Sequence, residues 1–218
     1  MNRILTLGLC AVLAVGISAF FNINQYDYIN LSLHAETQDT SVSDSSEIVE
    51  MTIGDVGAPV TMVEYASFTC PHCKNFHLNV FDKLKSEYID TGKVRFVFRE
   101  VYFDRFGLWA GMVARCSGEK SYFGMVDMIF QKQTEWTKGE QADIVNNLKK
   151  IGRVAGLDNE SLDSCLQDMD RAKAMVEIYR ANSVADKIES TPSFIINGKL
   201  YSNMDYNALK EVLDGKLN

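Results

Sequence analysis

Proline, glycine and cysteine are all scarce in this sequence. Its 218 residues include only 3 Pro, 14 Gly and 5 Cys, while 46% are hydrophobic. So little proline and glycine excludes collagen-like and low-complexity proteins, and the apolar content excludes a fully disordered chain. Five cysteines are too few for a disulfide-dense scaffold, but they are enough for two pairs and one left over.

Positive charge is also in short supply. There are 22 Lys and Arg against 29 Asp and Glu, which gives a net charge of -7. An acidic balance without basic runs argues against binding to the phosphates of nucleic acids.

The N-terminal segment is the longest apolar run in the chain. Residues 4–21 follow a single basic residue, Arg3, and contain no charged or strongly polar side chain. Such a stretch is either the apolar core of a signal peptide or a short membrane anchor, and we favour the cleaved signal. A buried helix of a cytosolic fold is less favoured, because the run has no polar face. Both favoured interpretations of residues 1–21 predict export, which permits disulfides.

Residues 22–50 predict a polar tether. They contain no Lys, Arg, Gly or Pro and are rich in Ser, Thr, Asn and acidic residues. This composition is typical of a solvated segment, and the segment is too short for a folded domain of its own.

A strand–helix–strand pattern follows. Residues 60–67 are mostly apolar, which predicts a buried strand, and apolar residues then recur at helical spacing up to residue 89. Residues 93–103 alternate basic or polar side chains with Val and Phe, which predicts a second strand. A unit of this kind predicts parallel strands joined by a right-handed crossover.

The rest of the chain predicts a helical block followed by a small β unit. From residue 104 to 189 several apolar stripes at helical spacing are separated by glycines, which predicts four or five packed helices. Residues 193–201 predict a hairpin, and residues 206–213 a short helix. We therefore expect an α/β domain of residues 51–103 and 190–218, interrupted by an inserted helical domain of residues 104–189.

The motif that carries chemistry is Cys70-Pro71-His72-Cys73, at the start of the helix that follows the first strand. A helix N-terminus offers unpaired N–H groups and the positive end of the dipole, which favour a thiolate on Cys70. Pro71 suits the first helical position because it has no N–H to leave unpaired. His72 is expected to lower the pKa of Cys70 further by positive charge or a hydrogen bond. Cys73, one turn in, would resolve the mixed disulfide.

Two other interpretations of this motif are weaker. A structural zinc site normally has four ligands, and Cys70, Cys73 and His77 supply only three. A purely structural local disulfide would not need a Pro-His pair inside it. We therefore expect neither a metal nor a cofactor.

Two segments resemble the DsbA-like thiol–disulfide oxidoreductases, a branch of the thioredoxin superfamily. Residues 64–73, EYASFTCPHC, resemble their active-site segment, and residues 190–199, STPSFIINGK, resemble the loop that carries their cis-proline. The resemblance covers about residues 51–218. It implies a thioredoxin fold with an inserted all-helical domain.

The resemblance also implies roles for single residues. Glu64 occupies the position of a buried acid that would relay a proton to or from Cys73. Pro192 matches the cis-proline, and Thr191 would then offer backbone hydrogen bonds to a bound client peptide, as Pro71 would contact the client beside Cys70. DsbA itself commonly has Val where this chain has Thr191, and isomerases are among the members that carry Thr.

Cys116 and Cys165 fall on apolar faces of predicted helices in the inserted block. Some DsbA-like proteins have a structural disulfide there, so the resemblance implies that these two residues pair. Two unpaired buried thiols are the alternative.

The function implied is a periplasmic oxidase that passes the Cys70–Cys73 disulfide to exported, cysteine-containing client proteins. It would be a monomer, reoxidised by a quinone-linked membrane partner of the DsbB type, and would be tethered to the inner membrane if residues 4–21 are not cleaved. A disulfide isomerase of the same fold remains open, as does a non-catalytic peptide-binding protein of the cell envelope.

Overall fold

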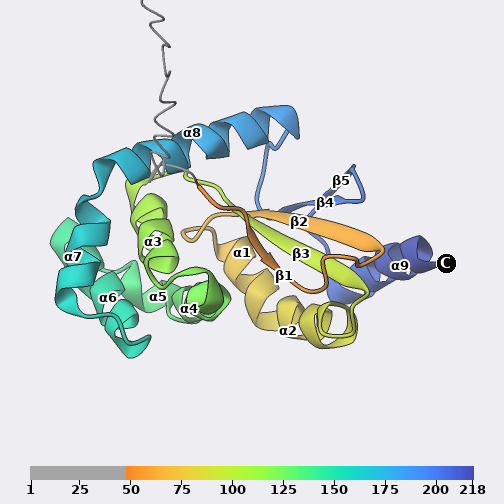
Figure 1. Ribbon diagram of the computed structural model, residues 1–218, viewed down its shortest axis with the longest axis horizontal. Coiled ribbons are helices and arrows are strands. Elements are labelled where there is room, and N and C mark those ends of the chain that lie inside the picture. Colours follow the sequence, from red (N-terminus) through yellow and green to blue (C-terminus); the bar gives the residue numbers. More distant parts are fainter. Residues whose placement is uncertain (1–47) are drawn as a thin grey trace, which may run out of the picture. The chain divides into compact units, whose positions relative to one another are not determined.

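The computed structural model describes residues 48–218 and is built on a mixed five-stranded sheet (Figure 1). The strand order is β1-β3-β2-β4-β5, in which β2 and β3 pair in parallel and the other neighbours are antiparallel. The strands are β1 (Met51–Ile53), β2 (Val60–Ala66), β3 (Val94–Glu100), β4 (Ser193–Ile196) and β5 (Lys199–Ser202).

One continuous helical segment, residues 71–89, connects the parallel strands β2 and β3. It consists of α1 (Pro71–Phe76), the π-helical turn η1 (His77–Phe81), α2 (Asp82–Leu84) and a second π-helical turn, η2 (Lys85–Ile89). π-Helical turns are rare and often occur at functional sites. The first of them begins at His77, one turn after Cys73.

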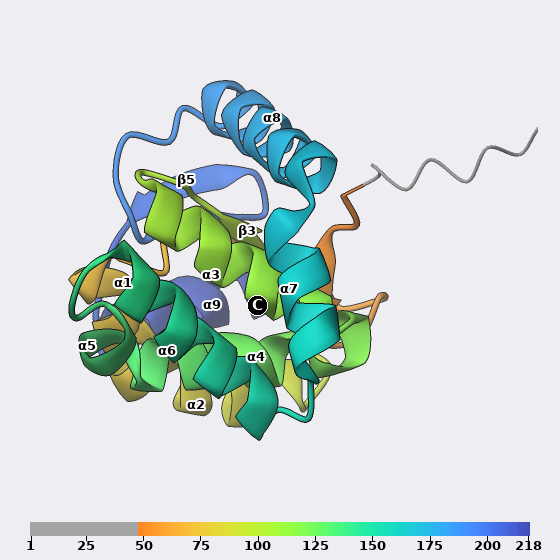
Figure 2. The ribbon, with the colours of Figure 1, turned by 90° about the vertical axis from the view of Figure 1, so that its left-hand side faces the viewer.

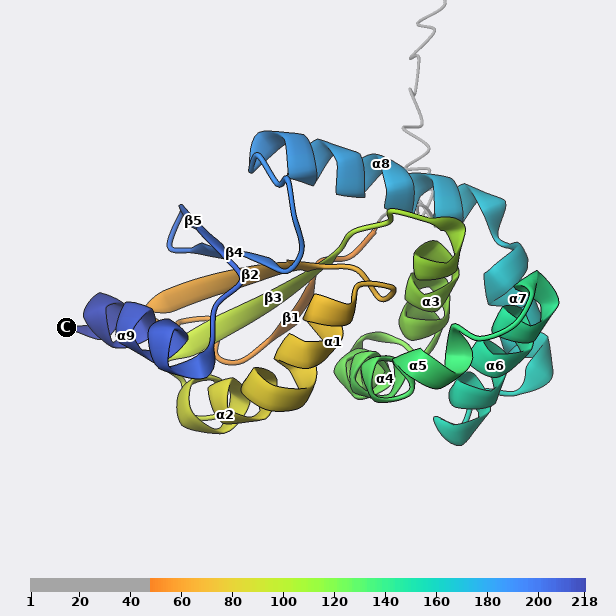
Figure 3. The same cartoon turned by 180° about the vertical axis from the view of Figure 1, so that it is seen from behind.

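Six helices lie between β3 and β4 in the part of the chain that the structure describes. They are α3 (Arg105–Cys116), α4 (Glu119–Gln131), α5 (Gln133–Trp136), α6 (Gln141–Val154), α7 (Asn159–Gln167) and α8 (Met169–Ala185). Helices α3 to α7 gather beside one end of the sheet, and α8 runs back across it (Figures 2 and 3). The last helix, α9 (Tyr206–Leu217), packs near β2.

The two faces of the sheet have different partners. On one face Met62, Ala66 and Phe98 join the main core, which includes the 71–89 helix, α9 and most of the helical block. On the other face Val63 and Tyr65 form a small cluster with side chains that include Tyr179 of α8. Because side chains alternate along a strand, Glu64 points toward the main core, where it is fully buried.

The predicted thioredoxin fold with a helical insertion is confirmed, and three details differ. The strand predicted for residues 93–103 is β3, which ends at Glu100. The helical block has one helix more than the upper estimate, because α5 is a single short turn and Asp168 separates α7 from α8. Strand β1 was not predicted, since three residues are too few to show a period.

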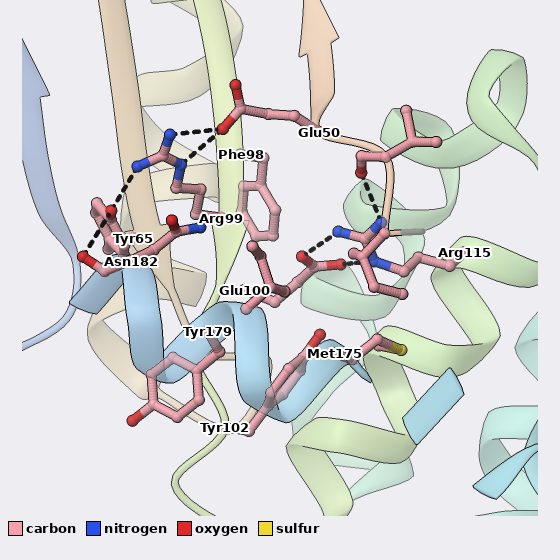
Figure 4. A pocket seen from close by; sticks show the side chains of 13 residues that line it. Glu50, Tyr65, Phe98, Arg99, Glu100, Tyr102, Arg115, Met175, Tyr179 and Asn182 are labelled. Atoms are coloured by element: carbon pink, nitrogen blue, oxygen red, sulfur yellow. Dashed lines mark hydrogen bonds and ion pairs between the residues drawn. The ribbon is translucent and has the colours of Figure 1, made fainter. Parts of the chain in front are cut away.

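The residues just before β1 attach to the domain across a cavity between β3 and α8 (Figure 4). Arg99 Nε donates to Glu50 Oε1 at 2.7 Å, and Arg115 Nη1 donates to the carbonyl of Val49 at 2.8 Å. Arg115 also forms a buried ion pair with Glu100. Val49 and Glu50, at the end of the segment predicted to be a tether, therefore contact two arginines of the domain.

The rest of that tether and the signal peptide or anchor predicted for residues 1–21 lie outside the described residues. Between residues 48 and 218 there is no helix long and apolar enough to cross a membrane.

Candidate active site

Cys70 and Cys73 lie at the N-terminus of α1, which a short loop connects to the end of β2. Cys70 is the N-cap residue, with an extended backbone conformation (φ -79°, ψ 122°), and Pro71 follows at the first helical position. Cys70 is partly exposed, whereas Cys73 is fully buried, and both are free thiols. Cys70 is therefore accessible at the start of the helix and Cys73 is buried one turn in, as the sequence predicts.

The two thiols have opposite electrostatic environments. The pKa of Cys70 is lowered to about 5, and the largest cause is a hydrogen bond from the Cys73 thiol. Thr191 and the backbone N–H groups of Cys73 and His72 lower this pKa further, whereas burial opposes them by raising it. Burial raises the pKa of Cys73 well above its ordinary range, and the thiolate of Cys70 and the charge of Glu64 raise it further. At neutral pH the exposed sulfur is a thiolate and the buried sulfur a thiol.

His72 acts on Cys70 differently from the sequence-based expectation. Its side chain is exposed, and its contribution to the lowered pKa of Cys70 comes from the backbone N–H. The reason is geometric: at the second helical position the N–H points toward the N-cap sulfur.

The loop before β4 faces the Cys70 sulfur. The Thr191–Pro192 peptide bond is cis, and Cys70 Sγ lies 3.5 Å from the carbonyl oxygen of Thr191. Pro192 is buried, and the hydroxyl of Thr191 is buried without a hydrogen-bond partner among the described residues. The two predicted site segments therefore meet at Cys70, although 121 residues separate Cys70 from Thr191.

Glu64 has a partner that the sequence did not suggest. His77 Nε2 lies 3.0 Å from Glu64 Oε2, and the two side chains are 1% and 0% exposed. Within residues 48–218 no group of three His, Cys, Asp or Glu side chains is arranged to hold a metal ion. His77, weighed as a third zinc ligand, is instead the partner of the buried acid, and its only sequence signal is its place one turn after Cys73.

Gln133 is a second residue that sequence reasoning missed. Its side-chain amide, buried at the start of α5, donates to the carbonyl of Phe68 at 2.7 Å and to that of Cys70 at 3.0 Å. Thr69, between them, donates to Asp104 at 2.7 Å, and Asp104 caps α3. The helical block therefore holds the loop that leads into the active site.

Cys116 and Cys165 are joined by a disulfide that links the end of α3 to α7. Their Cα atoms are 6.1 Å apart. The bond lies within the helical block, on elements other than those that carry Cys70 and Cys73.

Comparison with known proteins gives a consistent result. The family described as Thioredoxin matches residues 46–215. A putative protein-disulfide oxidoreductase of Rickettsia bellii is 32% identical over 166 residues, an alignment that covers 76% of this chain and 63% of that protein. The chain thus spans less than two thirds of the length of this relative.

Solved structures match the fold closely. The α-DsbA1 protein of Wolbachia pipientis has 30% sequence identity and a TM-score of 0.72, covering 76% of this chain and 89% of that one. BdbD of Bacillus subtilis has 26% identity and a TM-score of 0.69, covering 77% of this chain and 92% of that one. Together with the Cys-Pro-His-Cys motif facing a cis-proline, these matches place the chain in the thioredoxin family, among its DsbA-like members.

Proposed function

We propose that this protein is a thiol–disulfide oxidoreductase that introduces disulfide bonds into exported proteins. The observation that carries the proposal is the opposite electrostatics of its two active-site sulfurs, one a partly exposed thiolate with a pKa of about 5 and the other a buried thiol. A pair of this kind favours the reduced form, because its exposed sulfur is already stabilised as a thiolate. The oxidised form is then a good disulfide donor.

The reaction is a pair of thiol–disulfide exchanges. A client thiolate attacks Cys70 Sγ, the Cys70–Cys73 bond breaks, and its electron pair goes to Cys73 Sγ, which takes up a proton. A second client thiolate then attacks the client sulfur of the mixed disulfide and expels the Cys70 thiolate. The client is oxidised by two electrons and the Cys70–Cys73 pair is reduced by two.

Client binding is proposed at the Thr191–Pro192 loop and at the surface next to α1. The loop lies beside the Cys70 sulfur, and its backbone is available to pair with an extended client segment. A shallow depression next to α1, lined in part by His72, Phe76 and Met204, offers side-chain contacts to the same segment. Pro71 is exposed at the first position of α1, directly after Cys70.

The proposed place of action is the periplasm. The apolar segment 4–21 supports export, either with cleavage or as a tether to the inner membrane. Reoxidation of Cys70 and Cys73 is assigned to a quinone-linked membrane protein of the DsbB type, with the protein acting as a monomer.

A disulfide isomerase is the second candidate, favoured by Thr191 before the cis-proline. Isomerases of this fold usually have an element that makes them dimers or trimers, so a monomer in light scattering counts against this role. A non-catalytic peptide-binding protein is a third candidate. It gains nothing from an exposed thiolate, and insulin-reduction activity eliminates it.

The direct test is the trapping of clients. The Cys73→Ala variant is expected to accumulate mixed disulfides between Cys70 and client proteins, because the resolving sulfur is gone. The matched Cys70→Ala variant is expected to trap none. Recovery of no covalent partner from cells that express the Cys73→Ala variant, with wild type inactive on insulin, contradicts the proposal.

A further inference from the structure

His77 is enclosed by aromatic rings in the core beneath the active site. Its imidazole stacks between Phe130, with ring centroids 4.3 Å apart, and Phe81, at 4.8 Å. The edges of Phe76 and Phe98 close two further sides, at 5.8 and 5.7 Å. Among the described residues, the one hydrogen-bond partner of the ring is the carboxyl group of Glu64.

This arrangement leaves two polar atoms unpaired. Glu64 Oε1 and His77 Nδ1 are both buried with no hydrogen-bond partner among the described residues. Each such atom costs about 1–3 kcal/mol. An apolar side chain in place of His77 would fill the same aromatic box without a buried imidazole nitrogen, so packing alone does not explain a histidine here.

The buried sulfur of Cys73 needs a nearby group that can accept and return its proton. Cys73 is 0% exposed, so water does not reach it directly. Its proton must nevertheless leave and return in each turnover, because Cys73 alternates between thiol and disulfide. Glu64 is itself 0% exposed and is hydrogen-bonded to His77, which lies one turn after Cys73 on the same helical segment, and its charge helps to raise the pKa of Cys73.

We propose that His77 is a positioning residue that holds the Glu64 carboxyl ready to exchange a proton with Cys73. The proposal rests on the proposed function and adds a residue to it. Nε2–H donates to Oε2, which restricts rotation of the carboxyl and leaves Oε1 as the atom that takes the proton. The same hydrogen bond is made to the carboxylate and to the carboxylic acid, so it holds the group in place through both halves of the cycle.

The proton balance is closed. When Cys73 attacks Cys70 in a mixed disulfide, its S–H proton goes to Glu64 Oε1, its electron pair forms the Cys70–Cys73 bond, and the partner sulfur leaves as a thiolate. In the opposite direction, a client thiolate displaces Cys73, and the proton on Glu64 returns to the Cys73 sulfur. His77 neither gains nor loses a proton in this scheme.

The test uses the full chain with Cys10→Ser as background and the Cys116–Cys165 bond verified as intact by mass spectrometry. Reduced protein reacts with an aromatic disulfide, such as Ellman's reagent, whose released thiolate is coloured. The first phase of release reports attack by Cys70, and the second reports attack by Cys73. In the His77→Leu variant we expect the second phase to slow roughly tenfold or more, with the first phase changed by less than about twofold.

Two variants separate positioning from packing. His77→Gln keeps an N–H donor near the place of Nε2 and is expected to retain a second-phase rate within about threefold of wild type. Phe81→Leu removes a stacked ring but leaves the Glu64–His77 hydrogen bond, so it serves as a control for disturbed packing. Its second phase is expected to stay close to that of wild type.

The decisive comparison is a double-mutant cycle with Glu64→Gln. If His77 acts through Glu64, adding His77→Leu to Glu64→Gln slows the second phase by no more than about twofold. Equal slowing by His77→Leu with and without Glu64→Gln overturns the proposal. Absence of a second phase in wild type would instead mean that the proposed oxidoreductase function has failed.

If the His77→Leu variant does not fold, His77→Asn replaces it. Asn places its N–H group near Nδ1 rather than Nε2, so it cannot make the same bond to Glu64. A slow second phase with Asn and a fast one with Gln supports the proposal, and equal rates overturn it.

Discussion

Cys70 gains its reactivity from neighbours on two segments of the chain, α1 and the loop before β4. The Cys73 thiol is the largest cause of its lowered pKa, followed by Thr191 in the loop before β4 and then by backbone N–H groups of α1. A helix terminus alone would be common to many proteins. The combination of a second thiol and a facing loop is what makes this sulfur a thiolate at neutral pH.

Cys70 is therefore expected to be the fast-reacting thiol of the reduced protein near pH 6. Its reaction with iodoacetamide, followed against pH, should have a midpoint near the pKa of about 5. Cys73→Ala should raise that midpoint, because the largest stabilising hydrogen bond is lost. His72→Ala should raise it less, since the backbone N–H remains; a larger shift for His72→Ala than for Cys73→Ala would contradict this assignment.

The same thiolate makes the stability of the reduced protein depend on pH. The folded pKa of Cys70, about 5, lies below its ordinary value of 9.0. The resulting stabilisation is fully present above the unfolded value and is lost as the pH falls through the folded one. The unfolding free energy of the reduced protein minus that of the oxidised protein should therefore fall between pH 9 and pH 4. Urea titrations at each pH measure this difference. The Cys70→Ala variant lacks the thiolate, so its unfolding free energy minus that of the oxidised wild type should not fall over the same pH range.

At the scale of elements, the inserted helices do more than cover the sheet. Gln133 of α5 binds the carbonyls of Phe68 and Cys70, and Asp104, which caps α3, accepts a hydrogen bond from Thr69. The loop between β2 and α1 is thus held at three successive positions by the helical block. We infer that the block fixes the conformation in which Cys70 is presented.

Gln133→Ala is expected to lower the free energy of unfolding by about 2 kcal/mol, because it leaves the buried carbonyl of Phe68 without its donor. Chemical denaturation measures this change. Gln131→Ala is the matched control: Gln131 is exposed, its hydrogen bond to Asp127 is at the surface, and its loss should cost less than about 0.5 kcal/mol. Similar losses for the two variants would show that the Gln133 contacts are not stabilising.

The elements that could be predicted from the sequence share one property: their apolar residues form a recognisable pattern along the chain. Alternating and continuous apolar runs revealed β2, β3 and the hairpin, and helical spacing revealed the inserted block. The fold and the Cys70–Cys73 motif could therefore be predicted. Strand β1 could not, because it has only three residues and its pairing with β3 decides its conformation.

The missed site residues depend on contacts between distant segments. Gln133 lies 63 residues from Cys70, and a glutamine in a helical segment carries no local signal of its partners. His77 was visible one turn after Cys73, yet its partner on β2 became evident only when the sheet placed Glu64 against the helix. Local pattern thus predicts elements, whereas polar partners across elements need the fold.

For the whole molecule, the second disulfide belongs to the helical block alone. It closes a loop of 49 residues between α3 and α7. Joint replacement of Cys116 and Cys165 by Ala should lower the free energy of unfolding by about 4 kcal/mol or somewhat less, since the unfolded chain regains the entropy of the open loop. Denaturation of the oxidised protein measures this. The reactivity of Cys70 toward iodoacetamide should not change, and a clear change would show that the bond also shapes the active site.

The central claim is that the molecule as a whole is built to oxidise dithiols. The measurement that tests it most directly is equilibration with defined ratios of reduced and oxidised glutathione, reading the Cys70–Cys73 pair by mass spectrometry so that Cys116 and Cys165 do not enter the count. Because the Cys70 thiolate stabilises the reduced form, we predict a reduction potential clearly more oxidising than that of thioredoxin. The potential of thioredoxin is about -270 mV. A potential as reducing as that of thioredoxin would contradict the account.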